Sequence, residues 1–197
     1  MTVQVLYKNN NSQKLQANLV LFTDENFNIK VIKKYISREE FSYISDLLKT
    51  SDLKKDILHF EINSKKTIFL ASIKKDLKTS GAESLGAKFH NYINYDKRND
   101  YFVNSDTVNS KIENFLGHFL HGLKLKSYEF NIYKSKKSKR VISVKIIGNK
   151  NIISSQAQLK FKAIEEGTFF ARDLVSEPGN ILHPDEYAKR LNSLKKY

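Results

Sequence analysis

The feature that most constrains the fold of this chain is a repeated alternation between short β-rich segments and longer amphipathic stretches. The β-rich segments are dense in valine, isoleucine and aromatic residues and are bounded by polar turns, which is typical of strands. In the longer stretches apolar residues recur at spacings of three and four, which is typical of helices with one buried face. The predicted strands are 2–7, 17–23, 56–62, 66–73, 100–104 and 140–147. We therefore predict an α/β fold, a three-layer α/β/α domain with a mixed sheet.

Residues able to cap a first helical turn indicate where the helices begin. A Ser followed three residues later by Glu or Gln is a capping-box pattern, because each side chain can bond a free backbone N–H of the other residue. The candidates are Ser37 with Glu40, Ser80 with Glu83, Ser155 with Gln158, and Asp106 alone. They predict helices over about 38–50 and 155–175, and two further helices between these.

Several classes of protein are disfavoured by composition. The chain has no cysteine, which excludes a disulfide frame and a thiolate metal site. Its first residues lack the basic and apolar pattern of a secretory signal. Its longest apolar runs are far shorter than the roughly 20 residues of a membrane span. We expect a soluble cytoplasmic protein with no membrane partner.

A net charge of +13 raises the question of nucleic-acid binding. Of the 34 basic residues only five are arginine, the better residue for bidentate phosphate and base contacts. A lysine excess of this kind is also what an A/T-rich genome encodes. The loop 133–140 is the candidate contact segment, weak and non-specific for DNA, and a solvated loop is the alternative. Its candidate residues are Lys134, Lys136, Lys137, Lys139 and Arg140.

The end of the chain reads as a connector. Pro178 must end the preceding helix, because proline lacks an N–H and restricts the residue before it. Gly179 and Asn180 suit a tight turn, and Pro184 fits the first position of a new helix. We predict a domain over 1–150, a connecting helix and elbow over 151–183, and the start of another domain at 184–197.

Two segments carry a resemblance to a known family. The stretch "EGTFFARDLVSEPGNILHPDEYAKRL" and the stretch "GLKLKSYEFNIYKSKK" lie about 45 residues apart. Together they resemble the interdomain region of the leucyl aminopeptidase (cytosol aminopeptidase) family, with Ser176 where that family usually has Asn. The matching positions are Gly122, Leu123, Tyr128, Phe130, Tyr133, Lys134, Gly167, Ala171, Arg172, Asp173, Leu174, Val175, Pro178, Asn180, Pro184 and Ala188.

The resemblance implies a two-domain metallopeptidase. Its amino-terminal domain would be macro-domain-like and non-catalytic, with an assembly or regulatory role in a homo-hexamer. Its carboxyl-terminal domain would bind two divalent metal ions, Mn or Zn, and remove residues such as Leu from the amino termini of peptides. Those catalytic motifs lie beyond the elbow in the family. The alternative is a stand-alone nucleic-acid-binding module of macro-like fold.

No catalytic, metal or cofactor residue is predicted within the chain. His118 and His121 are spaced to reach one metal, but no third ligand is suggested. The seven glycines form no phosphate-binding loop, which disfavours ADP-ribose. Arg172 and Asp173 are interpreted as interdomain ion pairs or caps. With Pro178, Asn180 and Pro184 they make up the predicted interdomain linker.

Overall fold

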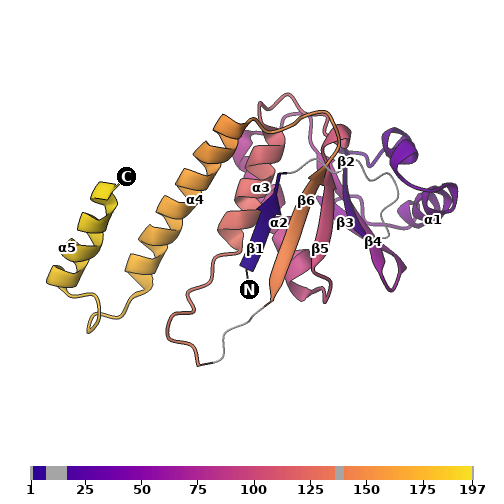
Figure 1. Ribbon diagram of the computed structural model, residues 1–197. Helices are drawn as coiled ribbons and strands as arrows, with labels where there is room; N and C mark the ends of the chain where they lie inside the picture. Colours follow the sequence, from indigo (N-terminus) through magenta and orange to yellow (C-terminus); the bar gives the residue numbers. More distant parts are fainter. Residues whose placement is uncertain (1, 8–16, 136–139, 197) are drawn as a thin grey trace.

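The computed structural model describes residues 2–7, 17–135 and 140–196, and its strands form one six-stranded sheet in the order β1-β6-β5-β2-β4-β3 (Figure 1). Neighbouring strands are parallel except β3, which runs antiparallel to β4 at one edge. The strands are β1 Thr2–Leu6, β2 Asn18–Asp24, β3 Ile57–Asn63, β4 Lys66–Ile73, β5 Asp100–Asn104 and β6 Val141–Ile147. The mixed sheet predicted from the sequence is confirmed.

Helices cover both faces of this sheet. The helices are α1 Arg38–Leu48, α2 Thr79–Tyr95, α3 Phe115–Lys126, α4 Ser155–Ser176 and α5 Pro184–Ser193; the 3-10 segments are Ile29–Tyr35, Ser105–Thr107 and Leu194–Lys196. One core joins α2 and α3 to the sheet, and a second core joins α1 and the segment 29–35 to the opposite face. This arrangement gives the predicted three layers, with α4 packed outside α3 (Figure 1). The narrower macro-like description stays a prediction.

The predicted helix starts are correct at the first helix and wrong at the second. Ser37 Oγ accepts from the Glu40 amide at 3.1 Å, and Glu40 Oε2 accepts from the Ser37 amide at 2.9 Å. Helix α2 instead has Lys78 at its N-cap, with no side-chain cap bond. Glu83 pairs with His118 on α3 at 3.0 Å, so a partner from another helix replaces the local cap.

Asp106 caps no helix, contrary to the prediction. It lies in the 3-10 turn 105–107, and α3 begins later, at Phe115. Its carboxylate accepts from the backbone amides of Asn149 and Lys150, at 2.6 and 2.7 Å. These two bonds connect the loop after β6 to the loop after β5 at the carboxyl edge of the sheet.

The start of α4 is shifted by one residue from the prediction. Ser154, not Ser155, accepts from the amide of Ala157 at 3.2 Å. The Gln158 side chain donates to the carbonyl of Ile153 at 2.8 Å instead of completing a capping box. The observed bounds, 155–176, otherwise match the helix predicted over about 155–175.

Two glycines allow α2 and α3 to lie unusually close together. A Cβ added at Gly86 would lie 1.8 Å from the carbonyl oxygen of Phe119, and one added at Gly122 would lie 1.9 Å from that of Glu83. Each helix thus presents a glycine to the backbone of the other. The resembling segment that begins at Gly122 is consequently fixed to the centre of the helical layer.

Candidate functional site

The end of α4 is fixed to the end of α3 through one tyrosine. The hydroxyl of Tyr128 donates to Asp173 Oδ1 at 2.7 Å. The Arg172 guanidinium lies 5.5 Å from the centre of the same ring and donates to the carbonyl of Leu125 at 2.6 Å. Partial burial, together with the bond to Asp173, raises the pKa of Tyr128. Arg172 therefore caps the last turn of α3, and the predicted interdomain ion pair stays a prediction.

The elbow between α4 and α5 is held by one carboxylate. Glu177 accepts from the Tyr133 hydroxyl and from Arg190 Nη1, the latter at 2.9 Å. These two donors hold the pKa of Glu177 below its usual range. Arg190 Nε also donates to Glu186 at 3.2 Å. Because Glu177 ends α4 and Arg190 lies on α5, the bond between Glu177 and Arg190 sets the direction in which α5 leaves the elbow.

Proline and turn geometry complete the elbow as the sequence suggested. The residue before Pro178 is extended, with φ −69° and ψ 137°, which ends α4. The carbonyl of Pro178 accepts from the amides of Ile181 and Leu182, at 2.9 and 3.0 Å, across a turn that contains Asn180. Pro184 is the first residue of α5.

The two resembling segments therefore meet in space. Tyr128 and Tyr133 come from one segment, and Asp173 and Glu177 come from the other. In Figure 1 the segment after α3 runs beside α4 and the elbow. These four residues of the two resembling segments thus join the end of α4 to the segment after α3.

The connector helices leave much apolar surface uncovered. Within the described chain α4 has one buried side chain, that of Phe161, and α5 has none. Figure 1 shows α5 standing beyond α4, away from the sheet. The large exposed apolar residues of this region are Leu159, Ile164, Val175, Ile181, Tyr187, Leu191 and Leu194. Such a surface is typical of an interface with further protein.

In the described part of the candidate nucleic-acid loop, residues 133–135 are exposed and Arg140 is half-buried. Lys136, Lys137 and Lys139 lie outside the described residues, and the amide of Lys134 donates to the carbonyl of Asn131 at 3.3 Å. The Arg140 guanidinium donates to Asn99 Oδ1 and to three carbonyls at the end of α2 and in the turn after it. These bonds make Arg140 a structural cap.

His118 and His121 each face a different carboxylate. His118 Nδ1 lies 3.0 Å from Glu83 Oε1, and His121 Nδ1 lies 3.1 Å from Glu165 Oε1. Both imidazoles contact the ring of Phe161, which separates the two pairs. Among residues 2–7, 17–135 and 140–196, no group of three or more His, Cys, Asp or Glu side chains is placed to hold a metal ion.

Three residues that hold α4 and the elbow in place were not predicted from the sequence. Phe161 anchors α4: its ring fills the space beside Gly117, where an added Cβ would lie 2.3 Å from a ring carbon. Glu177 and Arg190 form the bond across the elbow. The spacing of Phe161 within an apolar helix could have suggested an inward position. The elbow bond has no local signal, because its partners lie on opposite sides of two prolines.

Comparisons with known proteins support the resemblance to the aminopeptidase family. No protein-family model matches the chain. A probable cytosol aminopeptidase of Clostridium perfringens is 38% identical over 105 residues, which is 50% of this chain and 21% of that protein. One of Sinorhizobium fredii is 38% identical over 85 residues, 40% of this chain and 17% of that protein. The chain thus covers about a fifth of the length of the curated relatives that it matches.

Two solved structures share the fold. A cytosol aminopeptidase from Coxiella burnetii superposes with a TM-score of 0.66 over 98% of this chain and 37% of that one, at 11% identity. The bottromycin maturation enzyme BotP, solved in complex with Mn, gives 0.65 over 91% and 36%, at 13% identity. The fold is therefore the α/β class found as one part of larger aminopeptidase chains. The relatives that match the sequence are named cytosol aminopeptidases, so the resemblance to the leucyl (cytosol) aminopeptidase family predicted from the sequence is confirmed.

Within the described residues, each helix is too short or too polar to cross a membrane.

Proposed function

We propose that the chain is the amino-terminal, non-catalytic domain and connector of a leucyl aminopeptidase. Helix α5 carries this proposal: its start is fixed by Pro184 and its direction by the bond between Arg190 and Glu177, yet it buries none of its own side chains. A helix that is fixed in direction and carries exposed apolar residues is suited to pack against another part of the protein. The length of the curated relatives supports the same conclusion.

The activity of the full-length form is inferred from the resemblance. It would remove amino-terminal residues such as leucine from peptides by two-metal hydrolysis, in which the metals activate water and polarise the peptide carbonyl. The described residues do not fit that metal centre, since they hold no suitable cluster of ligands. The two divalent ions, Mn or Zn, would be held by residues outside this chain. The Mn complex of BotP supports metal use in proteins of similar fold.

The proposed partners follow from the exposed surface. The catalytic domain of the same polypeptide would cover apolar residues of α4 and α5, and the amino-terminal domains would help to assemble a homo-hexamer. The proposed boundaries remain 1–150 for the domain, 151–183 for the connector and 184–197 for the start of the catalytic domain. A cytoplasmic location is proposed from the names of the relatives.

The test compares two lengths of the same protein. The reading frame beyond Tyr197 is sequenced, and the 197-residue chain and the longer product are assayed with a chromogenic leucine amide and Mn²⁺ or Zn²⁺. We expect turnover and bound metal only in the longer product. A stop codon directly after Tyr197, or turnover by the repurified 197-residue chain with stoichiometric metal, would contradict the proposal.

A stand-alone nucleic-acid-binding module is the second candidate. The net charge of +13 favours it, because lysine charges neutralise phosphates without reading bases. Binding of this kind would be weak, non-specific and strongly dependent on salt.

A further inference from the structure

A hollow of about 730 Å³ lies between the β3–β4 hairpin and the carboxyl-terminal end of α2. In Figure 1 this region lies at the opposite end of the molecule from α4 and α5. The hollow has the size of an ordinary small-molecule site, about 300–1,000 Å³. A partner that covers only the connector would therefore leave the hollow accessible.

One wall of the hollow is aromatic. The His59 ring stacks on Phe69, with centroids 6.1 Å apart at 27°, and also meets Tyr92 at 5.2 Å. Tyr95, the last residue of α2, also lines the hollow and is 87% exposed. An aromatic side chain so open to solvent gains contact area when another ring packs against it. The wall is suited to a planar ring.

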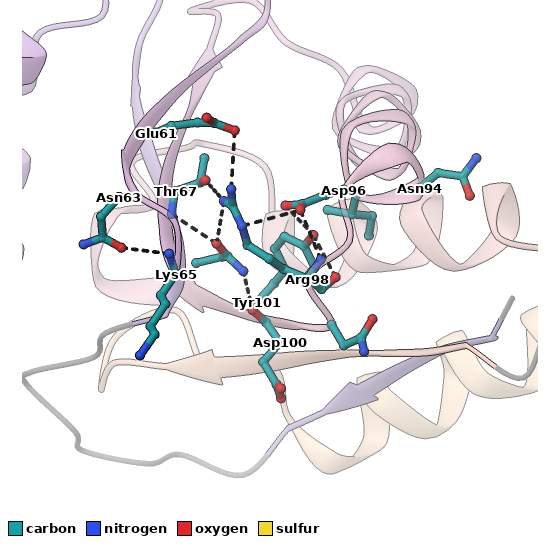
Figure 2. Close-up of polar contacts among 12 residues, drawn as sticks. Glu61, Asn63, Lys65, Thr67, Asn94, Asp96, Arg98, Asp100 and Tyr101 are labelled. Atoms are coloured by element: carbon teal, nitrogen blue, oxygen red, sulfur yellow. Dashed lines mark hydrogen bonds and ion pairs between the residues drawn. The ribbon is translucent and has the colours of Figure 1, made fainter.

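The other wall presents a fixed cation beside an exposed carboxylate (Figure 2). Arg98 Nη1 donates to Thr67 and to Asn18, and its Nε lies 3.5 Å from Asp96 Oδ1. Its Nη2 donates to Glu61 at 3.3 Å, and within the described chain this bond leaves one N–H of Nη2 unused. Four anchors thus fix the orientation of the guanidinium, so a ligand need not order it.

Among the described residues, Glu61 has a free oxygen, and Lys97 adds a second positive charge to the lining of the hollow. The Glu61 side chain is 71% exposed, and only its Oε1 is bonded within the described chain, which leaves Oε2 open. Lys97 is exposed and lines the same hollow. The hollow is therefore lined by a carboxylate paired with a guanidinium, by a lysine and by the aromatic wall.

We propose that this hollow binds a free aromatic α-amino acid. The ring would pack against His59 and Tyr95, the α-ammonium would bond Glu61, and the α-carboxylate would bond Arg98 and Lys97. An α-amino acid carries its ammonium and its carboxylate on the same carbon atom, which matches the adjacent Glu61 and Arg98. Aliphatic amino acids lack the ring, and aromatic acids lack the ammonium. The assignment does not depend on the proposed function.

The absence of tryptophan from the chain provides a direct probe. L-Tryptophan is titrated with the 197-residue protein, and the anisotropy of indole fluorescence reports binding. We expect saturable binding with Kd below about 1 mM. L-Tryptophanamide, which lacks the carboxylate and mimics the first residue of a peptide, and indole-3-propionate, which lacks the ammonium, should each bind at least tenfold more weakly.

Variants locate the binding in the hollow. Glu61→Gln should weaken tryptophan binding about tenfold and Tyr95→Ala about fivefold, because each substitution removes one contact with the ligand. Both side chains are exposed, so the fold should be kept. Tyr43→Ala on α1, also an exposed tyrosine at 47%, is the matched control and should bind normally. The circular dichroism of each variant checks the fold.

Three results would overturn the inference. These are no saturation up to about 1 mM tryptophan, equal binding of the amide or of indole-3-propionate, and normal binding by both Glu61→Gln and Tyr95→Ala.

Discussion

Replacing Gly122 by alanine tests how the two central helices pack. The added Cβ would lie 1.9 Å from the backbone oxygen of Glu83, whereas ordinary contact begins near 3.4 Å. Helices α2 and α3 would have to separate by about 1.5 Å. The obstacle is backbone, so no side chain can rotate away. The interface between α2 and α3 contains Phe89 and Phe119, which are both fully buried and would lose contacts as the helices separate.

The two opposing effects can be compared in magnitude. Overpacking a core costs about 1–3 kcal/mol, and a displaced backbone places this change near the upper end. Alanine is a better helix former than glycine by about 1 kcal/mol. The steric effect is larger, so we expect the free energy of unfolding to fall by about 2 kcal/mol. For a chain of this size that corresponds to a fall in Tm of about 4–8 °C.

The matched control is Gly167→Ala in α4, where an added Cβ would have no atom within 4 Å. It keeps the gain in helix propensity without the steric cost, so stability should rise by up to about 1 kcal/mol. Urea unfolding followed by circular dichroism measures both variants. If Gly122→Ala is as stable as Gly167→Ala, the close approach of α2 and α3 is not what requires glycine.

Three further predictions concern the anchor of α4, acid stability and DNA. Phe161→Ala should speed amide exchange throughout α4 at least tenfold, because it removes the one buried α4 side chain in the described chain; Leu159→Ala, at an exposed position, should not. Lys74 and Lys88 lower the pKa of Asp56, so its stabilising effect is present above its unfolded pKa, about 3.9, and is lost as pH falls through the lower folded pKa. Asp56→Asn should therefore lower the unfolding free energy by about 1 kcal/mol at pH 7 and progressively less below pH 4 in urea titrations. DNA binding, measured by anisotropy across a salt series, should be weak, and a sequence-selective complex would contradict this; its salt dependence should flatten when alanine replaces Lys136, Lys137 and Lys139.

Much of the fold could be predicted because its signals are local. Strand β4 has the predicted bounds, 66–73, since a mainly apolar run between polar turns indicates a buried strand. Ser37 caps α1 because the pair that bonds it lies within one turn. The prediction at Glu83 is wrong because His118, 35 residues away, competes for the same carboxylate. The 3-10 segment 29–35 was not predicted.

In the candidate site, too, local features could be predicted from the sequence, and contacts between distant residues could not. Proline restricts its own φ and its neighbour, so the elbow at Pro178 and the start of α5 at Pro184 could be predicted from the residues themselves. The bond from Tyr128 to Asp173 spans 45 residues, and no spacing rule relates them. Contacts of this kind depend on the packing of α4 against α3, which the sequence pattern does not specify.

The place of β1 in the sheet has a consequence for how the protein folds during synthesis. Strand β1 is made before the other described strands, yet within the described sheet its one neighbour is β6, with Thr2 opposite Val141, 139 residues later. At about 5–20 residues per second, the ribosome takes roughly 7–28 s to make the intervening chain. Closing so long a loop is also slow after synthesis, because its entropy is lost before the strand pair forms. Strand β1 thus remains without β6 until most of the described domain has been translated.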